Sequence, residues 1–203
     1  MLVLVRHGES VWNAGDRFAG WADIALTQKG CDEARKAGGF LLAQGVLPDV
    51  AHTSALRRAV SSAHLMLDAC GRSDVPLMRT SRLNERHYGA LQGMRRDEAV
   101  ARYGAEDVAR WRRGIAEQPP RDAHGRAESL ADVRRRLQPY VDDVLLPALD
   151  TGRTVLVVSH GNALRMLIQI VCRLTDAQAT ALDIATGAPM LLEEADGLLR
   201  RTG

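Results

Sequence analysis

Leu2-Val3-Leu4-Val5 runs into Arg6-His7-Gly8, and Val155-Leu156-Val157-Val158 runs into Ser159-His160-Gly161-Asn162. Each apolar run is short and rich in β-branched residues, which predicts a strand buried on both faces. Because parallel strands of an α/β fold end at one crevice, we expect His7 and His160 to meet there. Two imidazoles with an arginine beside the first favour phosphate chemistry carried by histidine.

The composition is that of one ordinary globular domain. The chain has 203 residues, 26% of them charged, and a net charge of +2, too small to indicate a nucleic-acid or membrane partner. Its one basic run, Arg134-Arg135-Arg136, fans out around a predicted helix and is interpreted as a solvated face. Cys31, Cys70 and Cys172 are scattered, which predicts neither a disulfide framework nor a zinc site. With no predicted signal peptide or membrane span, we expect a cytoplasmic protein.

Strands alternate with helices along the chain, which predicts an α/β layer fold with a mostly parallel sheet. Thr27 and Ser54 are the expected N-caps of two helices. Further elements are expected as strands at 49–52 and 76–80, helical pieces at 97–103 and 106–115, an exposed loop at 118–125, helices at 129–146 and 162–172, and a hairpin of 188–193 with 198–201 around Asp196-Gly197.

The cluster around His7 is suited to phosphoryl transfer. A histidine attacks phosphorus only as a neutral imidazole, and its other ring nitrogen then donates to a fixed acceptor. The Gly8 carbonyl is a candidate for that acceptor, and Arg6 supplies charge for the phosphoryl oxygens. Taken alone, Arg-His-Gly is equally compatible with a structural histidine at a strand end.

Three further segments favour an anion site. His160 and Asn162 precede a predicted helix whose N-terminal amides would face a bound anion. Arg58 is expected in the first turn of another helix, where only a bound anion favours an arginine, whereas Arg57 is interpreted as solvated. The irregular stretch Leu83–Gly93 contains Glu85, the one evident proton donor for a leaving oxygen.

A metal site is the alternative for the same side chains. His7, His160, Glu85 and His87 include zinc-type and iron-type ligands. Arg6, Arg58 and Arg86, however, would crowd a cation with positive charge. An anion site accounts for all of these residues together, so no metal is expected.

The chain resembles the histidine phosphatase superfamily and, more narrowly, the 2,3-bisphosphoglycerate-dependent phosphoglycerate mutases. The resemblance covers almost the whole chain, and its most specific segment is LNERHYGALQG at 83–93. The other matching motifs, in the family's order, are LVRHGESVWN, RFAGW, LTQKG, TSALRRA, RYG, WRR, SHGNALR and TGAP.

The resemblance implies a single domain of residues 1–203, a Rossmann-like three-layer sandwich with a small helical cap at about 82–125. It implies that His7 becomes phosphorylated, that Glu85 is the general acid–base, and that Arg6, Arg58 and His160 surround the phosphoryl group. It also implies interconversion of 3-phosphoglycerate and 2-phosphoglycerate in glycolysis and gluconeogenesis, primed by 2,3-bisphosphoglycerate. The implied substrate contacts are Ser10, Asn13, Gly20, Arg86, Tyr88, Arg96, Arg112, Arg113 and Asn162.

Departures from the family's pattern keep a phosphatase acting on a small phosphorylated metabolite as the nearest alternative. Ala19 stands where the family has threonine, and Arg96 where it commonly has lysine. A shorter loop after Pro120 and a shorter C-terminal end would leave the site wetter, which favours hydrolysis over transfer. A non-catalytic binding protein that retains the fold is a second alternative, and the oligomeric state is open between monomer and dimer.

Overall fold

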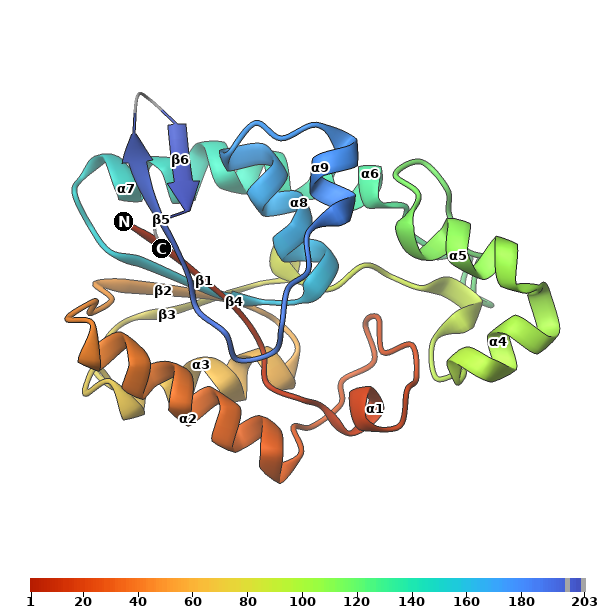
Figure 1. Cartoon of the computed structure of the whole chain (residues 1–203), viewed down its shortest axis with the longest axis horizontal. Coiled ribbons are helices and arrows are strands. Elements are labelled where there is room, and N and C mark those ends of the chain that lie inside the picture. The colour runs from red at the N-terminus through yellow and green to blue at the C-terminus, as the bar shows by residue number, and fades with distance from the viewer. Residues whose placement is uncertain (196–197, 202–203) are drawn as a thin grey trace.

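A mixed sheet forms the middle layer of the computed structural model, which describes residues 1–195 and 198–201 (Figure 1). Among the described residues the strand order is β3-β2-β4-β1-β5-β6. Strands β1 to β4 are mutually parallel, β5 pairs antiparallel with β1, and β6 pairs antiparallel with β5. The strands are β1 (Leu2–Arg6), β2 (Val50–Ser54), β3 (Leu77–Thr80), β4 (Val155–Ser159), β5 (Met190–Ala195) and β6 (Leu198–Arg201).

The two His-Gly strands are direct neighbours, as the sequence predicts. β1 and β4 pair in parallel with Arg6 opposite Ser159, and the His7 amide donates to the Ser159 carbonyl at 2.9 Å. Both histidines therefore leave the sheet at the same edge, side by side.

Alternating side chains of these strands enter two separate cores, so the predicted three layers are confirmed. Val3 and Val5 pack with α2 and α3 on one face, whereas Leu2 and Leu4 pack with α6 and α8 on the other. The first face carries α2 (Gln28–Ala43) and α3 (Arg57–Ala69). The second carries α6 (Leu130–Tyr140), the π-helical turn η3 (Val141–Leu145), α7 (Leu146–Asp150), α8 (Gly161–Val171) and α9 (Asp176–Ala181).

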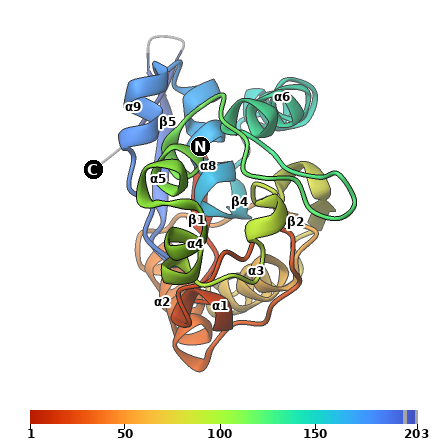
Figure 2. The same cartoon turned by 90° about the vertical axis from the view of Figure 1, so that its right-hand side faces the viewer.

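A third, smaller apolar cluster lies beyond the carboxyl edge of the sheet. It contains Phe18, Leu91, Ala99 and Val108, of which Ala99 belongs to α4 (Arg96–Tyr103) and Val108 to α5 (Ala105–Arg113). These two helices stand apart from the sheet layers in Figure 1, and in Figure 2, turned by 90°, they lie in front of the sheet. The remaining short elements are α1 (Val11–Ala14) and the 3-10 turns η1 (Ser81–Leu83) and η2 (Gly89–Leu91).

Some sequence predictions are wrong in detail. Ser54 is the last residue of β2 and not a helix N-cap, because α3 begins at Arg57 with Leu56 as its cap. The long helix expected at 129–146 continues through η3 to Asp150, and α1 and α9 were not predicted. β5 and β6 form the expected antiparallel pair, while Asp196-Gly197 lies outside the described residues. No described helix is long and apolar enough to cross a membrane.

The start of α2 touches the segment that follows His7. A Cβ atom built on Gly30 would lie 2.0 Å from the Glu9 carbonyl oxygen, so only glycine permits this approach. The Thr27 amide donates to the same carbonyl at 2.9 Å, and the Glu9 amide donates to the Glu33 carboxylate at 2.8 Å. The backbone after His7 is thereby fixed against α2.

Two glycine-to-alanine changes in α2 test this contact. We expect Gly30→Ala to lower the free energy of unfolding by about 1–3 kcal/mol, because the new methyl group overpacks the Glu9 backbone. A Cβ atom built on Gly39 meets nothing within 4 Å, so Gly39→Ala should instead raise the free energy of unfolding by about 0.5–1 kcal/mol through helix propensity. Urea unfolding of both variants measures the difference, and equal stabilities would contradict the close approach.

Candidate active site

His7 is held in one tautomer at the end of β1. The side chain is buried, and its Nδ1 lies 2.6 Å from the Gly8 carbonyl oxygen. Because a carbonyl only accepts hydrogen bonds, Nδ1 carries the proton and Nε2 keeps its lone pair. The Nε of Arg58 donates to that nitrogen at 3.3 Å. Gly8 is the acceptor expected from the sequence, and Nε2 is the nitrogen available for attack.

Both histidines are neutral at neutral pH. Burial, reinforced by the charges of Arg58 and Arg6, holds the pKa of His7 well below its usual range. Burial and the Arg58 charge likewise lower the pKa of His160. The two rings stand edge to face with their centroids 4.8 Å apart. A neutral His7 has the lone pair that nucleophilic attack requires.

Arg58 is fixed by the loop that contains Gly20. Its Nη2 donates to the Gly20 carbonyl and its Nη1 to the Ala22 carbonyl, both at 2.7 Å. Burial lowers its pKa to about 10, so the guanidinium remains charged at neutral pH. Gly20 has φ +50, a left-handed conformation that glycine adopts without strain. The cation beside His7 is thus preorganised before any ligand binds.

Glu85 lies between the two histidine strands and the region of α4 and α5. Its Oε1 accepts from the Arg86 amide at 2.8 Å and from the Asn162 amide at 3.2 Å. The Glu85 carbonyl accepts from Trp21 Nε1 at 2.6 Å. Both the side chain and the backbone of Glu85 are held by hydrogen bonds. Its carboxyl group is therefore well placed to exchange protons with a bound ligand.

Arg136 corrects the interpretation of the basic run as a solvated face. Arg135 is indeed exposed, and Arg134 pairs with Asp176 near the surface, but the Arg136 side chain is only 18% exposed. Its guanidinium donates to both carboxylate oxygens of Glu128 and to the carbonyls of Arg82, Asn84 and Glu85. Arg136 therefore clamps the backbone that carries Glu85.

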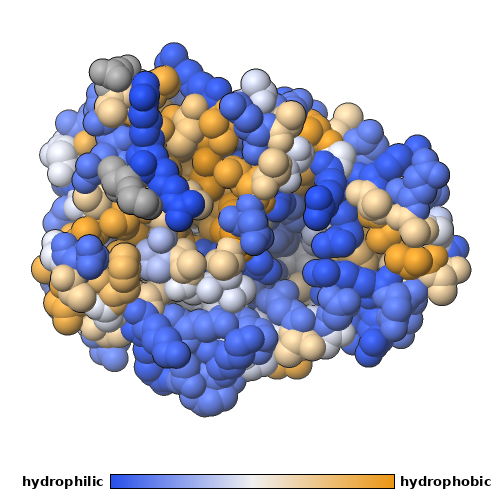
Figure 3. Space-filling model, in the orientation of Figure 1, coloured by the Kyte–Doolittle hydropathy of each residue, from blue (hydrophilic) through white to orange (hydrophobic). Residues whose placement is uncertain are grey.

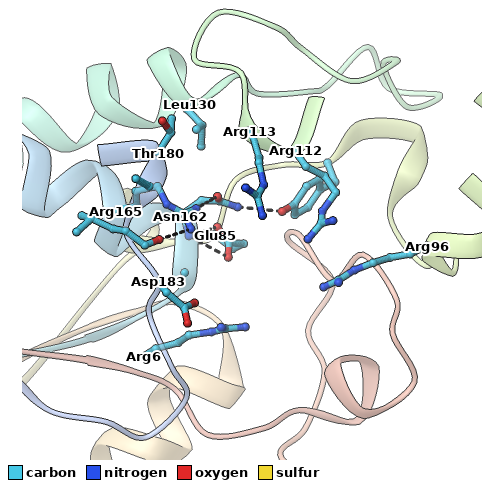
Figure 4. A pocket seen from close by; sticks show the side chains of 14 residues that line it. Arg6, Glu85, Arg96, Arg112, Arg113, Leu130, Asn162, Arg165, Thr180 and Asp183 are labelled. Atoms are coloured by element: carbon cyan, nitrogen blue, oxygen red, sulfur yellow. Dashed lines mark hydrogen bonds between the residues drawn. The ribbon is translucent and has the colours of Figure 1, made fainter. Parts of the chain in front are cut away.

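Two connected cavities open from this cluster. The smaller, of about 70 Å³, is lined by His7 and Arg58, and the larger, of about 380 Å³, lies beside it. Both share the lining residues Arg6, Glu85, Tyr88, Arg96 and Arg112. Arg6 of β1, Arg96 of α4, and Arg112 and Arg113 of α5 converge on the larger cavity (Figure 4). The surface is hollowed here, between the sheet layers and α4–α5, and hydrophilic side chains surround the hollow (Figure 3).

The predicted ligand contacts divide into two groups. Ser10 and Arg86 line neither cavity: the Ser10 hydroxyl caps α1, and the buried Arg86 donates to the carbonyls of Trp111 and Arg112. His160 is fully buried beneath the cavities, next to His7. The contacts that do line a cavity are Asn13, Gly20, Tyr88, Arg96, Arg112, Arg113 and Asn162.

Arg165 lines the larger cavity, although it was not predicted from the sequence. Its Nη1 donates to Asn162 Oδ1 at 2.7 Å, and Asn162 Nδ2 in turn donates to the Tyr88 hydroxyl at 2.9 Å. Arg165 follows Asn162 by three positions on α8, and side chains at this spacing share a helix face. That periodicity is the signal by which Arg165 could have been found.

The metal alternative has no matching cluster among the described residues. No group of three or more His, Cys, Asp or Glu side chains there is arranged to hold a metal ion. His87, one of the four candidate ligands, instead accepts from the Gly89 amide through Nδ1, and its ring lies tilted by 58° to that of Trp21.

Arg136 and Arg135 provide a matched pair of variants. We expect Arg136→Ala to lower the free energy of unfolding by about 2–4 kcal/mol, because it removes the cation paired with Glu128 and one donor from each of three carbonyls. Arg135→Ala removes a surface salt bridge with Asp132 and should change the free energy of unfolding by less than about 0.5 kcal/mol. Chemical denaturation checks both values, and similar losses would refute the clamp.

Comparisons with known proteins agree with this geometry. The family model of the histidine phosphatase superfamily (branch 1) matches residues 2–199. The 2,3-bisphosphoglycerate-dependent phosphoglycerate mutase of Corynebacterium diphtheriae is 42% identical over 222 residues, covering 100% of this chain and 90% of that protein. The protein of the same description from Mycobacterium leprae is 45% identical over 207 residues, covering 93% of this chain and 84% of that protein.

Solved structures share the fold at lower identity. A mycobacterial glucosyl-3-phosphoglycerate phosphatase complexed with VO3 has a TM-score of 0.83 and 28% identity, over 99% of this chain and 96% of that one. A structure described as mycobacterial hydrolase 1 has a TM-score of 0.84 and 26% identity, over 100% and 96% of the two chains. The chain belongs to the histidine phosphatase superfamily and, within it, to the family of 2,3-bisphosphoglycerate-dependent phosphoglycerate mutases.

Proposed function

We propose that the protein is a phosphoglycerate mutase that interconverts 3-phosphoglycerate and 2-phosphoglycerate through a phosphohistidine at His7. The observation that carries this proposal is the neutral His7, whose Nε2 lies beside the fixed Arg58 guanidinium and faces an arginine-lined cavity. Relatives at 42–45% identity bear the name of this activity. The reaction belongs to glycolysis and gluconeogenesis, and we propose a cytoplasmic location.

The lining charges fit a small phosphorylated three-carbon acid and its bisphosphate. The described lining residues of the larger cavity include five arginines and two carboxylates, Glu85 and Asp183. A mutase holds a multiply charged substrate in two orientations, which requires more cations than the binding of one phosphate group. When bound, 2,3-bisphosphoglycerate supplies the phosphoryl group that first charges the enzyme.

The residues divide the chemistry of transfer between them. His7 Nε2 uses its lone pair to form a bond to phosphorus while the phosphorus–oxygen bond of the donor breaks. The hydrogen bond from His7 Nδ1 to the Gly8 carbonyl stabilises the positive charge that then develops on the ring. Arg6, Arg58 and Asn13 line the space for the phosphoryl oxygens, and their charge and dipoles stabilise the transition state.

Glu85 exchanges the proton. Its carboxyl group protonates the substrate oxygen that leaves, and its carboxylate later takes the proton from the hydroxyl that attacks the phosphohistidine. We propose that the segment at about 82–125, which carries Glu85, Tyr88 and the cationic residues of α4 and α5, is a cap that excludes water during reorientation of the substrate. Arg96, Arg112 and Arg113 are the proposed contacts to the substrate from this segment.

A phosphatase of the same superfamily is the second candidate function. Phosphatases are among the solved structures with the same fold, and Ala19, without a hydroxyl, lines the smaller cavity. In this alternative, water instead of a substrate hydroxyl attacks the phosphohistidine.

A direct assay separates the candidates. Purified protein receives 3-phosphoglycerate with and without 2,3-bisphosphoglycerate, and 2-phosphoglycerate and free phosphate are followed together. We expect isomerisation that the bisphosphate stimulates, with little phosphate released. Phosphate release without isomerisation would establish the phosphatase, and neither product would favour a binding protein.

Variants of two histidines serve as controls for that assay. His7→Gln should reduce the rate by roughly 10³-fold or more, since the nucleophile is lost. His64→Gln changes an exposed histidine that contacts Arg79 outside both cavities, and it should leave the rate within about twofold.

A further inference from the structure

We propose that Ser54 is a positioning residue that holds His160 in the tautomer with its proton on Nδ1, so that this ring presents an N–H to the phosphoryl group received by His7. This inference rests on the proposed function, because that function supplies the phosphoryl group on His7. The tautomer itself follows from the contacts of Ser54 and His160 and does not depend on the reaction.

Ser54 and His160 meet in a fully buried place at the carboxyl edge of the sheet. Ser54 ends β2 and His160 follows β4, and these strands are parallel neighbours. Both side chains are 0% exposed, and Ser54 Oγ lies 2.7 Å from His160 Nε2. Water therefore does not compete for this hydrogen bond.

The other contact of the serine decides which way this hydrogen bond runs. The Leu56 amide donates to Ser54 Oγ at 3.2 Å, which leaves the hydroxyl one lone pair and one proton. Among the described residues, His160 Nε2 is the remaining partner of that hydroxyl. If Nε2 carried a proton, the hydroxyl proton would be buried without an acceptor, which is costly. With the proton on Nδ1 instead, the hydroxyl donates to Nε2 and both groups are satisfied.

The second ring nitrogen of His160, Nδ1, is buried and has no hydrogen-bond partner of its own among the described residues. The ring stands edge to face against His7, with the centroids 4.8 Å apart. A protonated Nδ1 here is a donor without an acceptor, and a phosphoryl oxygen on His7 is an acceptor of the required kind.

The two rings then share a tautomer and present opposite atoms. His7 donates from Nδ1 to the Gly8 carbonyl and presents the lone pair of Nε2. His160 accepts at Nε2 from Ser54 and presents the proton of Nδ1. Burial and the nearby arginine charges keep both rings neutral, which is consistent with this division. One neutral imidazole is thus the nucleophile and its neighbour a neutral hydrogen-bond donor.

Nitrogen-15 NMR of the histidine rings tests the inference without reference to activity. Long-range couplings between ring carbon-bound protons and the two nitrogens identify the protonated nitrogen of each histidine. We expect Nδ1–H for both His7 and His160 in the unmodified protein at neutral pH. In Ser54→Ala, His160 should lose this fixed tautomer, whereas His7 should retain it because its Gly8 contact is unchanged.

Ser159→Ala is the matched control. Ser159 is equally buried and adjacent to His160 in sequence, but its hydroxyl donates to the Leu83 carbonyl at 2.7 Å and not to the ring. We expect the His160 tautomer to be unchanged in this variant. A loss of the tautomer in both variants would indicate general disturbance of the strand ends and would overturn a specific role for Ser54.

Kinetics complete the test. Ser54→Ala should lower kcat by roughly 10²-fold with little change in KM, because the lost donor stabilises the transition state more than the bound substrate. An Nε2–H tautomer of His160 in the unmodified protein, or an unchanged kcat in Ser54→Ala, would overturn the inference. If the tautomer behaves as expected but the unmodified protein has neither mutase nor phosphatase activity, the proposed function fails and the tautomer assignment stands.

Discussion

The parallel pairing of β1 with β4 is the constraint on which the rest of the site depends. Their register places Arg6 opposite Ser159, so His7 and His160 emerge together although 153 positions separate them in the chain. Burial of both strands on two faces fixes this register, because a slip by one residue would move every side chain into the wrong core. The same burial lowers the pKa of both histidines and makes one of them a nucleophile at neutral pH.

Main-chain carbonyls, more than carboxylates, hold the arginines around this pair. Arg58 is bound by the carbonyls of the Gly20 loop, Arg86 by those of Trp111 and Arg112, Arg6 by that of Ile184, and Arg165 by that of Leu182. A carbonyl orients a guanidinium without cancelling its charge, whereas a carboxylate would neutralise it. The positive potential is therefore preserved for an anionic ligand, and little reorganisation is needed when the ligand binds.

Local patterns in the sequence predicted the strands and the His7 tautomer, whereas the lining residues Gly20, Tyr88 and Arg96 came from the family resemblance. The runs that end at His7 and His160 carry their own signals, and the Gly8 acceptor is adjacent in sequence. Contacts between distant segments carried no such signal. Arg136 was interpreted as solvated because its helix does not reveal that the Glu85 loop packs on it. Ser54 was interpreted as a helix cap because its bond to His160 exists only once β2 lies beside β4.

Trapping the phosphoenzyme tests most directly whether His7 receives the phosphoryl group on Nε2. The protein would be mixed with 2,3-bisphosphoglycerate, quenched in alkali to preserve phosphohistidine, and studied by peptide mass spectrometry and phosphorus NMR. We expect one acid-labile phosphoryl group, on Nε2 of His7, because Nδ1 donates to the Gly8 carbonyl. A phosphoryl group on Nδ1 or on another residue, or none at all, would contradict this expectation.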